Sequence, residues 1–276
     1  MTYAVRSAVV RFGDILALDD VTLLVEPGSV MAVVGGDGAG KTTLLRSLVG
    51  EVQLERGQVD APPPEAIGYL PATAGSWLSL TVAQNMDFVG GIYGLSGRDL
   101  ASRRDELLGR AALLDSVDRL SSQLSGGMRR KLGFCMAMLH DPPLLVLDEP
   151  STGVDPVSRV DLWRLVSEAA AAGAAVVMST TYLDEAERAA NLLALDRGRM
   201  LAGGTLQDVL DSFAGAIART ATPQRRGWAW RRGREFHEYW PTTAELPPDA
   251  VAVIPDLEDV VIAESLLRGH DSELAS

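Results

Sequence analysis

The sequence predicts an α/β fold, with one domain of about 200 residues around a parallel sheet and a smaller C-terminal appendage. Short apolar runs at residues 30–34, 144–147 and 174–180 are typical of strands that are buried on both faces. The first run leads into a glycine-rich segment and then into a helical pattern at residues 42–49. A strand, a loop and a helix in that order are the building unit of a parallel sheet.

The glycine-rich segment predicts a site for the phosphates of a nucleotide. It reads Gly35-Gly36-Asp37-Gly38-Ala39-Gly40-Lys41-Thr42, and Thr43 follows in the helix. Such glycines let backbone N–H groups surround phosphate oxygens, while the helix N-terminus adds partial positive charge. Lys41 would contact the β- and γ-phosphates, and the Thr42 hydroxyl can take a magnesium position. Lysine occurs only twice in the chain, so a chance match is rare, and an ordinary glycine-rich turn is the weaker alternative.

Two carboxylates, Asp148 and Glu149, follow the strand at residues 144–147. The carboxyl edge of a parallel sheet is where ligands bind. We expect Asp148 to hold Mg²⁺, directly or through water, and Glu149 to act as general base on an attacking water. An acidic junction between strand and loop is the alternative, but the phosphate loop upstream favours catalysis.

A second candidate anion site lies at Ser125-Gly126-Gly127, at the start of a predicted helix. A serine hydroxyl and free backbone N–H groups at a helix start can hold an anion. A chain that binds one nucleotide seldom needs two such cradles, and an ordinary N-capped helix remains the alternative.

Composition argues against several other classes of protein. The net charge of −12 opposes binding to the phosphates of nucleic acid. A single cysteine, Cys135, excludes an internal disulfide, and three scattered histidines give no metal-binding spacing. No apolar run reaches the roughly 18 residues of a membrane-spanning helix, and no secretion signal is visible, so we expect a cytoplasmic protein.

Taken together, these motifs resemble those of the ATPase subunits of ATP-binding cassette transporters. The resemblance rests on the phosphate loop, Leu124-Ser125-Gly126-Gly127-Met128, residues 144–150 and Ser151-Thr152-Gly153-Val154-Asp155-Pro156, in that order. It implies a P-loop NTPase (RecA-like) core with a parallel sheet, an antiparallel β subdomain and a helical subdomain at about residues 85–125. The cassette would cover residues 1–205, and residues 206–276 would form a small C-terminal extension.

The resemblance also implies partners. In the family two cassettes face each other head to tail, and each ATP with its Mg²⁺ lies between the phosphate loop of one and the Ser-Gly-Gly turn of the other. Ser125, Gly126 and Gly127 would therefore complete a partner's site. A membrane-spanning permease subunit would dock on the helical subdomain, which would place this chain on the inner face of the cell membrane.

Further roles follow from the matched positions. The resemblance assigns Phe12 to the aromatic residue that stacks on adenine and Asp155 to the loop that contacts the opposite cassette. Met128 stands where the family often has glutamine, which is similar to the branch that exports drugs, antibiotics or polysaccharides.

Two positions depart from the family pattern. Ala72 stands where a glutamine would reach magnesium and the attacking water, and Thr181 stands where a histidine would contact the γ-phosphate. A methyl group cannot bind a metal, and a threonine cannot supply a cation near neutral pH. Each lost group of this kind lowers turnover by about 100- to 1000-fold. We therefore expect ATP to bind and to be hydrolysed slowly, unless Thr180, Thr181 or water compensates.

The Ser-Gly-Gly turn is intact, whereas this chain's own site is degenerate. Together these two features predict an asymmetric pair of cassettes. The chain is similar to the first half of fused tandem-cassette ATPases, so its partner would be a second chain or a fused half. The alternative function is a nucleotide-gated regulatory or scaffolding protein without transport.

The extension interleaves basic and aromatic residues between positions 225 and 240. This pattern could serve RNA or an anionic membrane face, but acidic residues return after position 245. We favour a small β-rich unit whose tryptophans pack in its own core, with a helix near residues 255–262 that buttresses it.

Overall fold

The computed structural model describes residues 2–73, 75–241 and 246–274. Within them, the central sheet has six strands in the order β5-β6-β7-β3-β8-β9. The strands from β5 to β8 in this order are parallel, and β9 is antiparallel to β8. The strands are β3 (Val30–Val34), β5 (Ile67–Leu70), β6 (Leu144–Leu147), β7 (Ala175–Thr180), β8 (Asn191–Asp196) and β9 (Arg199–Gly204). The predicted α/β fold with a parallel sheet is confirmed, and the three apolar runs are β3, β6 and β7.

One face of the central sheet packs on α1 (Lys41–Leu48) and on an antiparallel sheet of order β2-β1-β4. These strands are β1 (Tyr3–Phe12), β2 (Ile15–Val25) and β4 (Arg56–Asp60). Val33 and Val177 of the central sheet share this core with Leu44 and Leu45 of α1. Because alternate strand residues point to opposite faces, β3 and β7 contribute to the cores on both sides.

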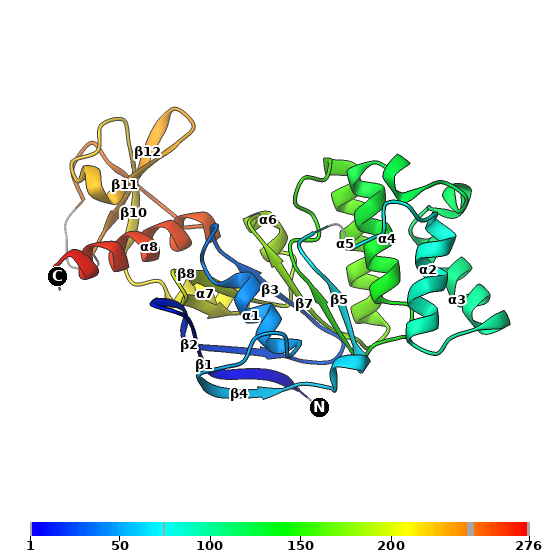
Figure 1. Cartoon of the computed structure of the whole chain (residues 1–276). Coiled ribbons are helices and arrows are strands. Elements are labelled where there is room, and N and C mark those ends of the chain that lie inside the picture. Colours follow the sequence, from blue (N-terminus) through cyan, green and yellow to red (C-terminus); the bar gives the residue numbers. More distant parts are fainter. Residues whose placement is uncertain (1, 74, 242–245, 275–276) are drawn as a thin grey trace.

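The opposite face is covered by α4 (Gly126–Ala137) and α5 (Pro156–Ala171). Farther out lie α2 (Val82–Ile92) and α3 (Gly97–Arg110), at the right of Figure 1. Thr81 and Gln84 form a reciprocal capping box at the start of α2. The Gln84 side chain is thus engaged in capping α2.

The C-terminal part forms a four-stranded antiparallel sheet of order β11-β12-β10-β13. Its elements and those that connect it to the core are α7 (Leu206–Ser212), β10 (Ala216–Thr220), β11 (Ala229–Arg232), β12 (Glu235–Trp240), β13 (Val251–Val253) and α8 (Leu257–Leu274). The short helix α6 (Leu183–Ala186) lies between β7 and β8 of the central sheet. Trp228 and Trp230 pack against this unit's own core, and Trp240 is buried. Whether the cassette ends at residue 205 stays a prediction.

Helix α8 is longer than the predicted segment and has a wider role. Figure 1 shows it running between the four-stranded sheet and the core of the cassette. Leu257 and Val260 are buried together with Ala32 and Val34 of β3. Helix α8 packs on the extension through Ala263 and Leu267, as expected, and its first turns also complete the cover of the central sheet.

Short 3-10 turns occupy Pro64–Ala66, Leu114–Ser116, Ser121–Gln123 and Arg226–Trp228. Among the helices that the structure describes, none combines the length and the apolar character needed to cross a membrane.

Candidate nucleotide-binding site

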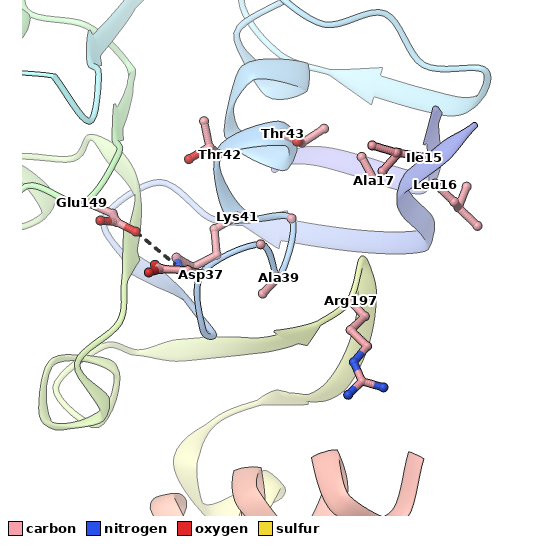
Figure 2. A pocket seen from close by; sticks show the side chains of 12 residues that line it. Ile15, Leu16, Ala17, Asp37, Ala39, Lys41, Thr42, Thr43, Glu149 and Arg197 are labelled. Carbon is pink, nitrogen blue, oxygen red and sulfur yellow. Dashed lines mark ion pairs between the residues drawn. The ribbon is translucent and has the colours of Figure 1, made fainter. Parts of the chain in front are cut away.

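The phosphate loop runs between β3 and α1, at the carboxyl edge of the central sheet. Lys41 is only 4 % exposed. Its Nζ donates to the carbonyl oxygens of Gly35 and Gly36 at 2.8 and 3.1 Å, and lies 3.3 Å from Oε1 of Glu149 (Figure 2). The predicted lysine, at the start of α1, and the predicted base, after β6, are thus brought together although they lie far apart in the sequence.

Gly40 precedes α1 with a φ of 104°, a left-handed conformation. A Cβ atom there would lie 2.9 Å from the Ala17 carbonyl oxygen. Glycine is required on both counts, and the close approach brings the β1–β2 hairpin against the phosphate loop.

A hollow of about 460 Å³ opens over the phosphate loop. The residues that line it are Ile15, Leu16, Ala17, Asp37, Gly38, Ala39, Gly40, Lys41, Thr42, Thr43, Glu149 and Arg197. Figure 2 shows Glu149 at one side of this hollow and the Ile15–Leu16–Ala17 segment at the other. Most of the predicted phosphate-binding residues therefore share one cavity with the predicted base.

Asp148 is fully buried and is not among the residues that line the hollow, but it is bonded to Thr42, which does line it. Its Oδ1 accepts hydrogen bonds from Thr42 Oγ1 at 3.2 Å and Ser179 Oγ at 2.6 Å. Its Oδ2 is buried without a partner among the described residues. A buried carboxylate oxygen without a donor is costly, and a hydroxyl beside it is a second oxygen ligand. Thr42 and Asp148 therefore fit Mg²⁺, an ion that usually takes one or two protein ligands together with phosphate and water.

Glu149 has a φ of 48°, which is unusual for a residue with a side chain. Its N–H donates to Ser179 Oγ at 2.9 Å, and its Oε2 accepts from Thr152 Oγ1 at 3.1 Å. Strained backbone of this kind persists where neighbouring groups hold it, and it concentrates at functional sites. Ser179 contacts both acidic residues and was missed by the sequence analysis, although it is a polar residue near the end of a predicted strand.

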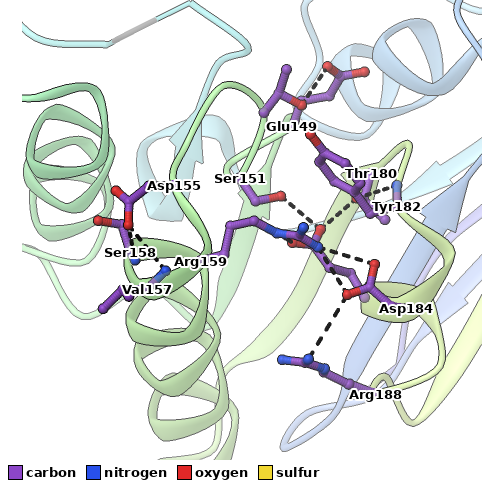
Figure 3. Close-up of polar contacts among 12 residues, drawn as sticks. Glu149, Ser151, Asp155, Val157, Ser158, Arg159, Thr180, Tyr182, Asp184 and Arg188 are labelled. Atoms are coloured by element: carbon purple, nitrogen blue, oxygen red, sulfur yellow. Dashed lines mark hydrogen bonds and ion pairs between the residues drawn. The ribbon is translucent and has the colours of Figure 1, made fainter.

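Glu185 of α6 (Leu183–Ala186) links the loop after β6 to the end of β7. Figure 3 labels three of its partners, Ser151, Arg159 and Thr180. Its Oε2 accepts from Ser151 Oγ at 2.7 Å and from Thr180 Oγ1 at 2.6 Å. Its Oε1 accepts from Arg159 Nε at 3.1 Å, and Arg159 also stacks on the Tyr182 ring. One buried carboxylate thus holds the loop after Glu149 and the end of β7 in a fixed relation.

The two positions predicted to depart from the family pattern, Ala72 and Thr181, are both exposed. The carbonyl of Ala72 accepts a hydrogen bond from the Arg130 guanidinium, which also donates to the carbonyls of Pro71 and Thr73, each at 3.1 Å. Burial lowers the pKa of Arg130, and the charges of Asp148 and Glu149 oppose that shift. The Arg130 guanidinium therefore holds the loop after β5 through three backbone carbonyl groups.

Thr181 follows the inward-facing Thr180 and is exposed. The Thr180 hydroxyl donates a hydrogen bond to Glu185 and accepts one from the Tyr182 N–H at 3.0 Å. It is therefore occupied within the described fold rather than directed at a ligand.

Ser125 is the N-cap of α4, and its Oγ accepts from the Met128 N–H at 3.2 Å. Gly126 of the turn helps to line a separate hollow of about 200 Å³ with Arg129, Arg130, Thr152, Gly153 and Val154. Among the described residues, this hollow and the phosphate hollow have no lining residue in common. The turn thus does not close over this chain's own phosphate loop.

Asp155 and Phe12 also lie outside the phosphate hollow. The Asp155 carboxylate caps α5 by accepting from the N–H groups of Val157 and Ser158, which lowers its pKa. Phe12 is half exposed and pairs across the hairpin with Ile15, which does line the hollow. Arg197 and residues 15–17 were missed by the sequence analysis because no local pattern marks them.

This phosphate loop at the carboxyl edge of a parallel sheet, with an acidic pair on the neighbouring loop, defines the class of P-loop nucleotide-binding proteins. Comparison with known proteins then gives the family. Residues 18–152 match the family model described as ABC transporter. The chain belongs to the ATP-binding proteins of ABC transporters.

Among its relatives is the Nod factor export ATP-binding protein I of Cupriavidus metallidurans, 35 % identical over 215 residues, which are 74 % of this chain and 71 % of that protein. The probable multidrug ABC transporter ATP-binding protein YbhF of Escherichia coli is 35 % identical over 201 residues, 69 % of this chain. The chain spans only 35 % of the length of YbhF.

Solved structures agree with this assignment. The ATP-binding subunit of an ABC transporter superposes with a TM-score of 0.71 and 29 % identity, over 77 % of this chain and 93 % of that one. A dimeric bacterial ABC transporter cassette gives a TM-score of 0.68 at 21 % identity, over 75 % of this chain and 99 % of that one, and so shows the shared fold. The predicted P-loop fold and the predicted family are confirmed.

Proposed function

We propose that this chain is the ATP-binding subunit of a membrane exporter. It binds ATP with Mg²⁺ at its own slow, degenerate site and completes the active site of a partner cassette with Ser125, Gly126 and Gly127. The observation that carries the proposal is the phosphate hollow, which Lys41 and Thr42 line. Thr42 is bonded to the buried Asp148, whose second carboxylate oxygen has no partner among the described residues. The names of the relatives, which mention multidrug ABC transport and Nod factor export, support the export branch.

When bound, Mg²⁺ would supply positive charge to the phosphates through Thr42 and Asp148. The Lys41 ammonium would leave Glu149 for the β- and γ-phosphates, because a triphosphate is a stronger anion than one carboxylate. Glu149 would then be free to accept a proton from the attacking water. The hydrogen bond from its N–H to Ser179 Oγ would keep its backbone in place meanwhile.

Slow turnover is supported by what surrounds the two substituted positions. The Ala72 loop is held by its carbonyl oxygens, which cannot position a water as a glutamine amide would. The Thr180 hydroxyl, the nearest candidate to compensate, is bonded to Glu185. Of the two threonines Thr181 remains, beside water, and its hydroxyl can donate one neutral hydrogen bond.

A second cassette is supported by the position of the Ser125 turn, which lines a hollow other than this chain's own phosphate site. The dimeric cassette of similar fold gives a precedent for such pairing. Because this chain's own site lacks two groups, we propose a heteromeric partner, separate or fused, with a complete site.

Docking of a permease subunit is supported by an apolar surface on the helical part. Trp77, Phe88 and Ile92 are exposed, and the Trp77 and Phe88 rings pack edge to face with centroids 4.6 Å apart. Beside them a hollow of about 210 Å³ lies between the loop after β5, α2 and α4. Exposed apolar patches of this kind mark protein or membrane contacts. We propose that this surface places the chain at the inner face of the cell membrane.

Two variants separate the two roles of the chain. Lys41→Ala should abolish ATP binding, because it removes the cation of the phosphate loop. Ser125→Arg should leave ATP binding to this chain intact and block turnover in the partner's pocket. Equal loss of nucleotide affinity in both variants, measured by equilibrium titration, would refute the division of labour.

Steady-state ATPase assays with and without the co-purified partner separate transport from a purely regulatory role. The proposal requires low activity for the chain alone and restored activity in the complex. Activity that stays absent in every membrane complex would instead favour a nucleotide-gated scaffold.

A further inference from the structure

The turn between β8 and β9, residues 196–200, is a wall of the nucleotide hollow. Arg197 lines the hollow, although Figure 2 shows its side chain directed away from Lys41. The N–H of Gly198 donates to the carbonyl of Ala39 in the phosphate loop at 3.0 Å. The carbonyl of Gly198 accepts from the Asp19 N–H at 2.8 Å. The turn is therefore bonded to the phosphate loop and to β2.

The packing around this turn leaves little space for a shift. Gly198 has a φ of +77°, and a Cβ atom there would lie 2.6 Å from the Ala17 carbonyl oxygen. Arg199 also forms a salt bridge with Asp19 at the same hairpin. Phosphate binding depends on the direction of backbone N–H groups. A displacement of this turn would therefore change the conformation of the phosphate loop.

The other side of the same turn is held by α8 of the C-terminal extension. Ser265 Oγ donates to Asp196 Oδ2 at 3.0 Å, and the Arg268 guanidinium donates to the carbonyl of Met200. These two contacts flank Arg197 in the chain. The turn is thus bonded to α8 on one side and to the phosphate loop on the other.

Helix α8 joins this turn to the four-stranded sheet. Its Ala263 and Leu267 pack with Ile217 and Tyr239 of that sheet. A movement of the extension would therefore shift the last turns of α8, while the first turns stay buried against β3. The Ser265 and Arg268 contacts lie in the part that can respond.

We propose that the C-terminal extension regulates ATP affinity at this chain's own site, through α8 and the turn at residues 196–200. The inference rests on the proposed function, since it concerns the same nucleotide site. While Ser265 and Arg268 of α8 contact the turn, the turn supports the phosphate loop in its binding conformation. When α8 shifts, the hydrogen bond from Gly198 to Ala39 weakens and the affinity for ATP falls. Thermodynamic linkage requires the reverse as well, so bound nucleotide stabilises the seat of α8.

The test uses the full chain with Ser265→Ala and Arg268→Ala combined. The matched control is Arg231→Ala, which removes an extension arginine whose guanidinium donates to Gly233 within its own hairpin. We expect about 5-fold weaker ATP–Mg²⁺ binding in the double variant, at the lower end of typical allosteric coupling, and wild-type binding in the control. When Arg268→Lys takes the place of Arg268→Ala in the double variant, a donor for the carbonyl of Met200 is kept, and part of the affinity for ATP should be recovered.

Amide hydrogen exchange supplies a readout that does not depend on hydrolysis. In the double variant the Gly198 amide should exchange several-fold faster than in the control, because its bond to Ala39 is loosened. In the wild-type chain, saturating ATP should slow exchange around Ser265 and Arg268. Unchanged affinity in the double variant, or exchange at α8 that ignores ATP, would overturn the proposal. A wild-type chain that binds no ATP would refute the proposed function instead, and the Gly198 exchange would still test the coupling.

Discussion

Ser179→Ala is the smallest change that should expose how the acidic pair is held. Ser179 is fully buried, and its hydroxyl donates to Asp148 at 2.6 Å and accepts from the Glu149 N–H at 2.9 Å. The variant removes one oxygen atom and leaves the partly buried N–H of Glu149 without an acceptor. A buried group left without a partner costs about 1–3 kcal/mol, and a hydrogen bond to a charged group contributes about 1.5–3 kcal/mol. Because the Glu149 N–H is only partly buried, we expect a loss somewhat below the sum of the two, a fall of about 2–5 kcal/mol in the free energy of unfolding.

The assay is urea-induced unfolding of the nucleotide-free chain, followed by circular dichroism, with Ser47→Ala as the control. Ser47 is also buried, but its hydroxyl donates to the Thr43 carbonyl within α1 at 2.9 Å. That carbonyl keeps its backbone partner in the helix, so the control should lose only about 0.5–1.5 kcal/mol. Equal destabilisation of the two variants would refute the role assigned to Ser179.

Four further predictions concern the phosphate loop, the loop after β5 and Cys135 in α4. Gly35→Ala should lower the melting temperature strongly, because its Cβ would lie 2.3 Å from the Leu195 carbonyl oxygen, whereas Gly36→Ala, with nothing within 4 Å, should leave the fold intact. Arg130→Ala should speed amide exchange in the loop after β5, and an unchanged rate there would show that the guanidinium does not hold it. Burial raises the pKa of Cys135 to about 12, so iodoacetamide at pH 9 should label it only in denaturant. The same shift means that the thiol's contribution to stability is complete below its unfolded pKa near 9 and is lost as pH rises toward 12, which urea titrations at pH 8 and pH 10 would detect.

The sequence by itself determined the core strands and the glycine-rich loop between β3 and α1. Residues 30–34 form β3 without a shift in boundary, because a strand buried on both faces needs an unbroken apolar run. Lys41 and Thr42 were predicted to contact phosphate and magnesium because the glycine-rich motif gathers such residues within a few consecutive positions. Such features are local, so a pattern along the chain suffices to find them.

Only the tertiary structure decided how the site is held and what adjoins it. Ser179 meets Asp148 across 31 residues, and Glu185 meets Ser151 across 34. The sequence also gave no sign that α8 would reach past its own sheet to the turn beside the phosphate loop. These contacts depend on strand order and helix packing, which bring distant residues together, and no spacing in the sequence encodes a contact of that range.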